Sequence, residues 1–503
     1  MKHLSRFGFI LACACFLGLS LNQRSVGSVA LLPNNQSATS LLENAAYEDA
    51  IVDAEYSSMF NGSFMQAGVV EAIDGASDDL FGYAVALSNN TALIAAPYAD
   101  TVTTANQGAV YVLVRDAVGW SQQQKIEIAD IAPDSAFRYT LALSGDTALV
   151  GVWWADVNGN SRQGSVYVYV RNGSTWSLQQ KLVAIDGAAN SYFGQAVALA
   201  GDSALIGAYR SDVANNTDQG AAYVFVRNGN SWAQQQKLVA SDGVRDDNFG
   251  YSVALDGDTA LIGSYSADIG ANVDQGAAYI FVRNGSVWNQ QQKLDASDGE
   301  TQIRFGETLA LSGDTALVGT YRSDVDKKID QGSAYIFFND NGRWIQQQKL
   351  TDRSGVANDL FGYAMALKGN VALIGAPGTD IGQKGNQGAV HVFVRNGQTW
   401  YQQETLIAQD GSQNDLWGYA VSLDSNTSLI AAPYADTDLN NNQGKVYSFD
   451  RNALGMSKHY SSDRISSPVP LAVRVVVTAP LGVSTVVVTD TIASGLEFVT
   501  GSL

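Results

Sequence analysis

The sequence contains few of the residues that most often carry out chemistry. It has three His and two Cys among 503 residues. Two Cys cannot build a disulfide scaffold or a cysteine-ligated zinc site, and three His leave little for acid–base or metal catalysis. Only 8 Pro are present, which argues against a proline-rich linker protein.

Positive charge is also scarce. There are 30 Lys and Arg against 49 Asp and Glu, so the formal net charge is −19. A chain this acidic is a poor nucleic-acid binder, because phosphate contacts need clustered Lys and Arg. Charged residues make up only 16% and hydrophobic residues 46%, which is enough for a large core, and the 49 Gly indicate short strands joined by tight turns.

The N-terminus has the order of a secretory signal peptide, which we place at residues 1–30. Lys2 and Arg6 precede a mostly apolar run over 7–21, and small residues follow up to Ala30. The alternative is a single membrane anchor, although the run is short for a span of about 20 residues. Export would remove both Cys and three basic residues and lower the net charge from −19 to −22. Residues 31–60 are interpreted as a spacer, and no later stretch resembles a transmembrane segment.

An internal repeat of 56 residues dominates the rest of the chain. Phe-Gly or Trp-Gly pairs begin at Phe81, Phe193, Phe249, Phe305, Phe361 and Trp417, with Phe137-Arg138 in the remaining position. Gln-Gly pairs keep the same step at Gln107, Gln163, Gln219, Gln275, Gln331, Gln387 and Gln443, as do Trp120, Trp176, Trp232, Trp288, Trp344 and Trp400. Seven copies without an insertion predict a repeat architecture.

Each repeat predicts four strands, at 251–255, 260–263, 276–283 and 288–294 in one copy. Asn284-Gly285 between the last two is a strong hairpin signal. A four-stranded unit cannot bury both faces alone, so the sequence predicts an all-β, seven-bladed β-propeller over residues 61–455. Lysines recur in the fourth strand, where we interpret them as edge charges that oppose aggregation.

The ring must also close. Met456 stands where the seventh repeat would have its Trp, whereas Phe64 lies 56 residues before Trp120. We therefore predict that residues 64–73 supply the outer strand of the last blade. Local closure by residues 456–462 is the alternative.

Further motifs carry a family resemblance. Phe-Gly is followed by Ala-Ala-Pro at 95–97 and 431–433 or Gly-Ala-Pro at 375–377, and then by Gly-x-Val-Tyr. Over about residues 64–451 the chain resembles the FG-GAP repeat, found in the head of integrin α subunits and in secreted bacterial proteins. The resemblance implies extracellular adhesion or ligand binding. The integrin-type calcium loop between the first and second strands is absent, because tight turns such as Gly145-Asp146 stand there.

The longer loops, between strands 2 and 3 and between strand 4 and the next strand 1, should share one face. Asp recurs in the first loop at Asp100, Asp156, Asp212, Asp268, Asp324, Asp380 and Asp436, and in the second at Asp74, Asp130, Asp186, Asp242, Asp298 and Asp410, with Ser354 as the exception. Turn capping explains such recurrence. The alternative is weak Ca²⁺ binding, for which the best candidates are Asp436, Asp438, Asn440 and Asn442; no other cofactor is expected.

Residues that differ between repeats are the better candidates for ligand recognition. Those just after the second strand are Tyr98, Trp153, Trp154, Tyr209, Arg210, Tyr265, Tyr321, Arg322 and Tyr434. Aromatic and Arg side chains are favoured at binding hot spots, and the alternative is packing between blades. His391 occupies a position where other repeats have Tyr, so we interpret it as a strand residue. No Ser/His/Asp set or metal-ligand cluster is evident, and no catalytic residue is proposed.

The composition changes after about residue 463. Residues 456–470 are interpreted as a linker and 471–503 as a partial Ig-like module, because Val488-Thr489-Asp490-Thr491-Ile492 and its continuation resemble the Ig-like conserved-repeat module (domain of unknown function 11). The match covers about 35 residues, whereas a complete sandwich needs about 100. A short strand pair docked on the propeller is the alternative.

Together these features predict a secreted or cell-surface propeller, monomeric, that binds an extracellular protein or glycan and has no catalysis of its own. A structural spacer within a larger surface protein and a propeller hydrolase or lyase are the alternatives. The binding hypothesis requires the varied aromatic and Arg side chains to be exposed, and the enzyme hypothesis requires converging carboxylates at the central opening.

Overall fold

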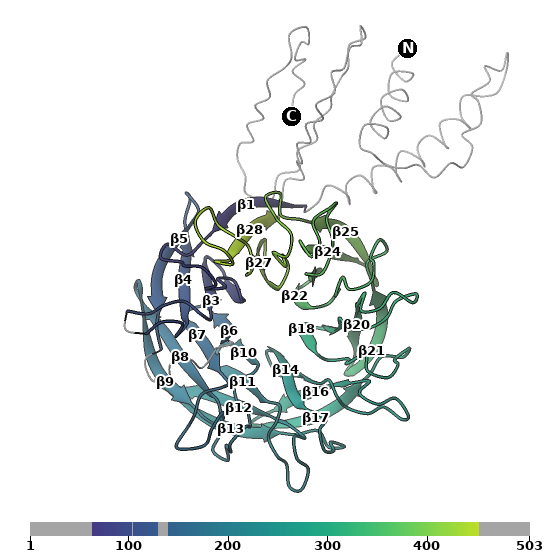
Figure 1. Ribbon diagram of the computed structural model, residues 1–503. Coiled ribbons are helices and arrows are strands. Elements are labelled where there is room, and N and C mark those ends of the chain that lie inside the picture. The colour runs from purple at the N-terminus through teal and green to yellow at the C-terminus, as the bar shows by residue number, and fades with distance from the viewer. Residues whose placement is uncertain (1–62, 103, 129–138, 452–503) are drawn as a thin grey trace, which may run out of the picture. The chain divides into compact units, whose positions relative to one another are not determined.

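The computed structural model of the protein describes residues 63–102, 104–128 and 139–451. Within these residues, 28 strands form seven four-stranded antiparallel sheets. The sheets stand as blades around a common axis (Figure 1). The predicted seven-bladed propeller is therefore confirmed. The signal peptide, the spacer, the linker and the Ig-like segment lie outside the described residues.

The strands of each blade are ordered from the axis outward. The innermost strands are β2 (Ala84–Ser88), β6 (Tyr139–Ser144), β10 (Val197–Ala200), β14 (Phe249–Asp256), β18 (Thr308–Ser312), β22 (Ala364–Lys368) and β26 (Ala420–Asp424). The second strands are β3 (Thr91–Ala96), β7 (Thr147–Val152), β11 (Ser203–Ala208), β15 (Thr259–Ser264), β19 (Thr315–Thr320), β23 (Val371–Ala376) and β27 (Thr427–Ala432). The third strands are β4 (Ala109–Arg115), β8 (Ser165–Asn172), β12 (Ala221–Asn228), β16 (Ala277–Asn284), β20 (Ser333–Asp340), β24 (Ala389–Asn396) and β28 (Lys445–Arg451). The outer strands are β5 (Trp120–Ile126), β9 (Thr175–Leu182), β13 (Ser231–Leu238), β17 (Val287–Leu294), β21 (Arg343–Leu350), β25 (Thr399–Leu406) and, for the last blade, β1 (Phe64–Val70). Blades are numbered 1 to 7 from β2.

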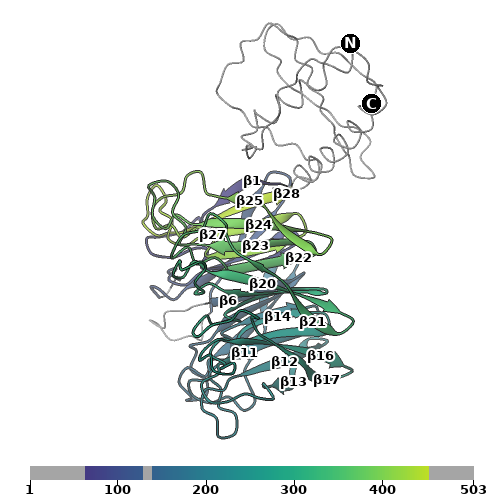
Figure 2. The ribbon, with the colours of Figure 1, turned by 90° about the vertical axis from the view of Figure 1, so that its right-hand side faces the viewer.

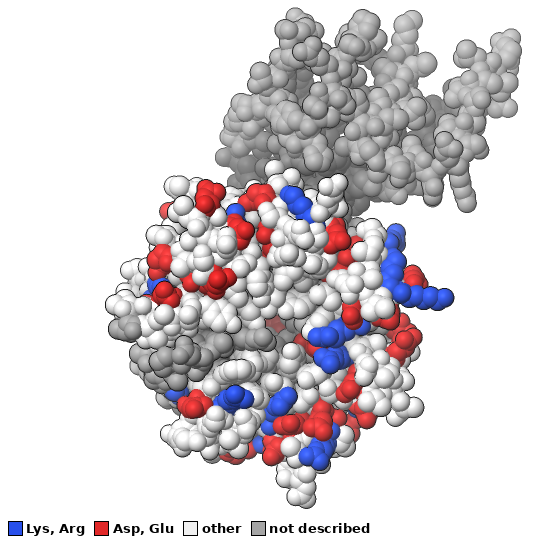
Figure 3. Space-filling view, in the orientation of Figure 1, with Lys and Arg blue, Asp and Glu red and all other residues white. Residues whose placement is uncertain are grey.

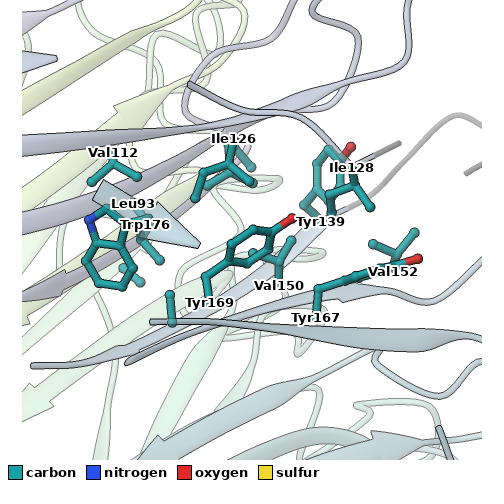
Figure 4. Packing of buried hydrophobic residues seen from close by; sticks show 14 of the residues in the cluster. Leu93, Val112, Ile126, Ile128, Tyr139, Val150, Val152, Tyr167, Tyr169 and Trp176 are labelled. Carbon is teal, nitrogen blue, oxygen red and sulfur yellow. The ribbon is translucent and has the colours of Figure 1, made fainter. Parts of the chain in front are cut away.

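The hydrophobic core lies between neighbouring blades. The second strands are almost entirely buried, as in β7, where all six residues are buried. In one core cluster, Leu93 and Val112 of blade 1 belong with Val150, Tyr169 and Trp176 of blade 2 (Figure 4). Because each cluster draws on two sheets, a blade acquires a complete core only when it has neighbours.

The N-terminal strand closes the ring. β1 pairs antiparallel with β28 from Phe64 opposite Arg451 to Val70 opposite Val446. Phe64 is buried in the cluster that joins blades 6 and 7. Closure by residues 64–73 is thus confirmed, with the strand ending at Val70. The alternative segment, 456–462, lies outside the described residues.

Glutamine side chains join the outer strands of successive blades. The Gln236 amide donates to the Trp288 carbonyl (2.8 Å) and accepts from the Trp288 N–H (2.8 Å). The same reciprocal pair joins Gln124 to Trp176, Gln180 to Trp232, Gln292 to Trp344 and Gln348 to Trp400. At the next junction Glu404 replaces Gln and accepts from the Phe64 N–H (2.8 Å). An ionised carboxylate has no proton to donate in return.

Glu404→Gln should therefore stabilise the propeller. The new amide can complete the reciprocal pair found at the five preceding junctions, a gain of about 1 kcal/mol in the free energy of unfolding. Burial raises the pKa of Glu404, and a carboxyl with a raised pKa loses stabilising effect as pH rises through that pKa. The advantage of the variant should therefore grow between pH 4 and pH 8 in urea denaturation. Gln348→Glu provides the converse at the preceding junction, and a gain of stability from that change would contradict the explanation.

The outer-strand lysines differ from the prediction of exposed edge charges. Lys293 Nζ binds Asp242 Oδ2 (2.7 Å) and lies 5.4 Å from the centre of the Tyr279 ring, and its side chain is only 28% exposed. Equivalent Asp–Tyr–Lys trios are Asp74, Tyr111 and Lys125; Asp186, Tyr223 and Lys237; and Asp298, Tyr335 and Lys349. Each trio ties the loop that enters a blade to the outer strand of that blade.

Candidate ligand-binding face

The two faces of the ring differ in loop length. First and second strands are joined by two-residue turns, such as Gly145-Asp146 between β6 and β7. The loops between second and third strands, and those that lead from one blade to the next, are longer. Figure 2 shows the longer loops extending on the left-hand side of the ring, and we call this side the long-loop face. Variable loops on a rigid scaffold are the usual location of function.

The recurring Asp of the first long loop caps that loop in all seven blades. In blade 4, Asp268 Oδ1 accepts from the Asp274 N–H (2.9 Å). The same contact, six residues apart, is made by Asp100, Asp156, Asp212, Asp324, Asp380 and Asp436. The turn-capping interpretation is confirmed for this loop, whereas Asp74, Asp186, Asp242 and Asp298 of the second loop pair with lysines.

The residues proposed for calcium take part in local contacts of the loop 436–442. Asp436 accepts from the Asn442 N–H (2.8 Å), Asn442 donates to Asp78 Oδ1 (2.8 Å), and Asn440 donates to the Gly75 carbonyl (3.0 Å). Asp438 is exposed. In the part of the chain that the structure describes, no group of three or more His, Cys, Asp or Glu is placed to hold a metal ion. Weak Ca²⁺ binding here stays a prediction, and an unchanged melting temperature in excess EDTA would remove it.

The nine side chains predicted for recognition lie on the long-loop face but are not equally accessible. Arg210 and Arg322 are exposed. The expectation of exposure is wrong for Trp153, which is 7% exposed because it packs edge-on against Trp154 and Tyr192. The remaining aromatic residues are half-buried, namely Tyr98, Trp154, Tyr209, Tyr265, Tyr321 and Tyr434.

The structure joins most of these rings into two runs of contacts around the axis. One run passes through Trp154, Trp153, Tyr192, Tyr209, Tyr251 and Tyr265, with ring centres 4.5–5.5 Å apart. The other links Tyr321, Tyr363, Tyr419 and Tyr83, with Tyr434 beside Tyr419. Tyr98 makes no ring contact with either run. We call these two runs, with the charged residues described next, the mouth of the ring.

Five tyrosines of the mouth were not among the sequence candidates, namely Tyr192 and four that share one repeat position. That position lies two residues after the Phe of Phe-Gly or the Trp of Trp-Gly and is occupied by Tyr83, Tyr139, Gln195, Tyr251, Glu307, Tyr363 and Tyr419. That position lies within two residues of the start of the innermost strand, at the end nearest the long loops. Within this otherwise regular position, the replacement of Tyr by Gln195 and Glu307 was the sequence feature that could have identified these residues as part of the mouth.

Glu307 lies between the two runs. Its residue is 4% exposed. Its Oε1 accepts from the Tyr321 hydroxyl (3.2 Å) and is 3.4 Å from Arg304 Nη1 and 3.8 Å from Arg322 Nε, while its Oε2 is buried without a hydrogen-bond partner. Burial raises the pKa of the Glu307 carboxyl against the lowering effect of the two arginines. No carboxylate is among the groups that shift the pKa of Glu307.

Four arginines of the mouth lie against aromatic rings. Arg162 is 4.9 Å from the centre of Trp154, and Arg304 is 5.5 Å from that of Tyr265. Arg210 lies over Tyr192 and Tyr209, and Arg322 lies over Tyr321. Such cation–π contacts hold a guanidinium group in place while its N–H edge stays available. Figure 3 shows this face hollowed at its centre, with basic side chains mainly below and to the right of the hollow.

Buried Asp side chains in the loops between blades give the propeller a pH dependence. Asp247 Oδ2 accepts from the Val244 N–H (2.8 Å), and burial raises the pKa of Asp247 to about 6. The raised pKa means that stability is lost as pH rises from about 4 to about 6. We expect Asp247→Asn to abolish on the order of 1–2 kcal/mol of this loss, because the amide oxygen can still accept from Val244. Urea titrations at pH 4.5 and 7.5 measure it, with Asp202→Asn, in an exposed turn, as the control; equal pH dependence in both variants would contradict the assignment.

No helix that could span a membrane occurs in residues 63–102, 104–128 or 139–451.

Comparison with known proteins agrees with the fold. The family model of the FG-GAP repeat matches seven segments, residues 64–113, 120–169, 176–225, 232–281, 288–337, 344–393 and 400–449. Comparison with curated proteins finds no matching sequence. Among solved structures, a chain of "Crystal Structure of Mitotic Checkpoint Complex" is 12% identical, covering 77% of this chain and 94% of that chain with a TM-score of 0.45. That likeness is too low to carry an inference about function.

Proposed function

Because the chain belongs to the FG-GAP repeat family, we propose that its propeller is a binding module for an extracellular protein or glycan, with no catalysis of its own. The ligand contacts are assigned to the mouth of the ring on the long-loop face. The N-terminal signal-peptide pattern supports a secreted or cell-surface location, and we propose that the ring acts as a monomer.

The proposal rests on one observation, that the repeats differ where the mouth lies and agree elsewhere. The Phe-Gly, Gln-Gly and Trp positions serve contacts between blades and hardly change. By contrast, one mouth position is occupied in turn by Tyr98, Trp154, Arg210, Ser266, Arg322, Gly378 and Tyr434, and another by Leu80, Tyr192, Asn248, Arg304, Leu360 and Leu416 among its described members. Variation that the fold does not require is expected where a ligand is recognised.

The side chains at these positions have the chemistry of binding hot spots. Tyr, Trp and Arg supply large contact areas with polar ends, and they dominate hot spots in measured interfaces. Arg210 and Arg322 are exposed, and Trp154 and Tyr321 are half-buried, so a ligand can contact them without displacing a blade. The spacer alternative assigns these residues no role beyond packing.

A binding array tests the proposal. Purified protein is applied to immobilised glycans and extracellular-matrix proteins, and hits are measured in solution. Trp154→Ala/Arg210→Ala should weaken the ligand by at least about tenfold, since each lost hot-spot side chain costs about 1–2 kcal/mol. Arg343→Ala, an exposed Arg in the short hairpin of blade 5 on the opposite face, is the matched control. A ligand that is held equally by both variants does not bind at the mouth, and the proposal would then be wrong.

A further inference from the structure

Positive charge is unevenly distributed in this acidic protein. With a net charge of −19, the chain should repel anions over most of its surface. Four arginines nevertheless gather at the mouth, within blades 2 to 5 and the loops that join them, namely Arg162, Arg210, Arg304 and Arg322. In blades 6, 7 and 1 the corresponding positions are occupied by Tyr, Leu, Gly and Asn. The arginines of the mouth therefore lie on one side of it, where the repeat position of Arg162 is Asp in blades 3 to 5 (Asp218, Asp274 and Asp330).

These arginines are not neutralised by partners of their own. Among the described residues no carboxylate lies within ion-pair distance of Arg162 or Arg210, and Arg304 and Arg322 share a single oxygen of Glu307. Asp218 and Asp330 act on Arg210 and Arg322 only at longer range. The side chains of Arg304 and Arg322 are 38% and 47% exposed. Guanidinium donors are thus left available at the mouth.

Glu307 acts here as a positioning residue. Its buried carboxylate holds Arg304 and Arg322 toward one point and also accepts from Tyr321. In five other described blades the same position is Tyr, which carries no charge at neutral pH. A buried acid that replaces Tyr at the one place where two arginines meet is explained if the arginines have to be held in a fixed arrangement. A fixed guanidinium pair presents several N–H groups to one anion.

The chemistry of the mouth suits a saccharide. Exposed aliphatic side chains do occur in the long loops of the same face, at Val102, Val273, Ile329 and Leu439, but they are not among the residues of the mouth. The mouth instead has half-buried Trp and Tyr rings beside the arginines, which suit the flat faces of sugar rings that bear anionic substituents.

We infer that the mouth of the ring selects an anionic saccharide, with its carboxylate or sulfate groups bound by Arg304 and Arg322 and by Arg162 and Arg210, and its rings against the adjacent aromatic faces. This inference rests on the proposed function and adds the class of ligand.

Matched probes separate charge from shape. Titration calorimetry with oligogalacturonate and with its methyl ester compares a carboxylated sugar with a neutral one of the same rings, and sulfated dextran with dextran does the same for sulfate. We expect the charged member of at least one pair to bind at least tenfold more tightly, and its affinity to fall as salt is raised from 50 to 200 mM.

Variants locate the site. Arg304→Gln/Arg322→Gln should reduce the affinity at least tenfold, and Arg343→Gln should leave it unchanged. Because the first variant leaves Glu307 buried without its cations, Arg162→Gln/Arg210→Gln provides a second test at positions with no carboxylate partner, and a loss of at least threefold is expected there.

The outcomes distinguish this inference from the proposed function. Equal affinity for charged and neutral probes, or an array ligand that is a protein bound through the mouth, overturns the anionic saccharide and leaves the binding module intact. Binding of a charged probe that neither folded double variant weakens also overturns the assignment to the mouth. If no glycan and no protein binds at all, both are wrong.

Discussion

Deletion of residues 1–70 is expected to prevent stable folding of the propeller, whereas deletion of residues 1–62 should leave it folded. The first deletion removes β1, and with it every backbone hydrogen bond to the outer side of β28. It also removes Phe64, which is 5% exposed, and loss of one buried Phe alone costs about 3–5 kcal/mol. An unpaired β28 would in addition offer an edge for aggregation.

Thermal melting and size-exclusion chromatography of the two shortened chains measure this effect. A synthetic peptide of residues 63–72 should restore a cooperative transition to the longer deletion, since it can add as a strand to β28. A scrambled peptide of the same composition is the control. If both shortened chains melt at the same temperature, the strand that closes the ring is not β1.

The second large effect is expected from Gly276→Ala, at the Gly of a Gln-Gly pair. Gly276 has φ +83°, and an added Cβ would overlap the Phe305 carbonyl oxygen and lie 2.5 Å from the Phe305 nitrogen. Both are backbone atoms of the neighbouring blade, anchored by the bond from the Phe305 N–H to the Gln275 carbonyl (2.7 Å), so neither can move without opening the contact between blades. We expect a loss of at least about 3 kcal/mol, well above the 1–2 kcal/mol of a left-handed conformation alone.

Gly285→Ala separates the cost of the left-handed backbone conformation from the cost of steric overlap with the neighbouring blade. Gly285 also has a positive φ, +64°, but nothing lies within 4 Å of an added Cβ in its hairpin turn. Its substitution should cost only about 1–2 kcal/mol. Urea denaturation of both variants gives the difference, and similar losses at the two sites would show that close approach between blades does not explain the Gln-Gly pair.

The sequence was sufficient for features that depend on local pattern. The 56-residue step placed the strands to within one or two residues in the copy analysed, as with β15 at Thr259–Ser264 against the predicted 260–263. It also indicated the closing strand, because Phe64 lies one step before Trp120. These inferences succeed because equivalent positions in the repeats have the same structural environment. A residue type that recurs at one position therefore makes the same contacts in each blade.

The mouth could be predicted only in part, because its contacts join residues from different blades. The position of Glu307 was visible in the sequence, but its approach to Arg322 and Arg304 depends on how the loops meet at the axis. Trp153 was expected to be exposed because it follows a strand, yet the ring of Tyr192 from the next blade covers it. Likewise, the lysines of the outer strands gave no indication of the Asp partners that precede their blades.

The Asp–Tyr–Lys trios determine where two propellers of this kind can be joined to make a chimaera. In blade 6 all three members are replaced together, by Ser354, His391 and Thr405. His391 is 1% exposed, and its Nδ1 contacts Gln402 Nε2 (3.0 Å) and Thr405 Oγ1 (3.3 Å), so this blade has a substitute network of its own. Joint replacement is expected of three side chains that depend on one another for their contacts. The members extend from the entering loop to the outer strand, so a chimaera cut just before the loop Asp keeps each trio whole. A cut placed at the first strand of the blade would pair the Asp of one parent with the Lys of another.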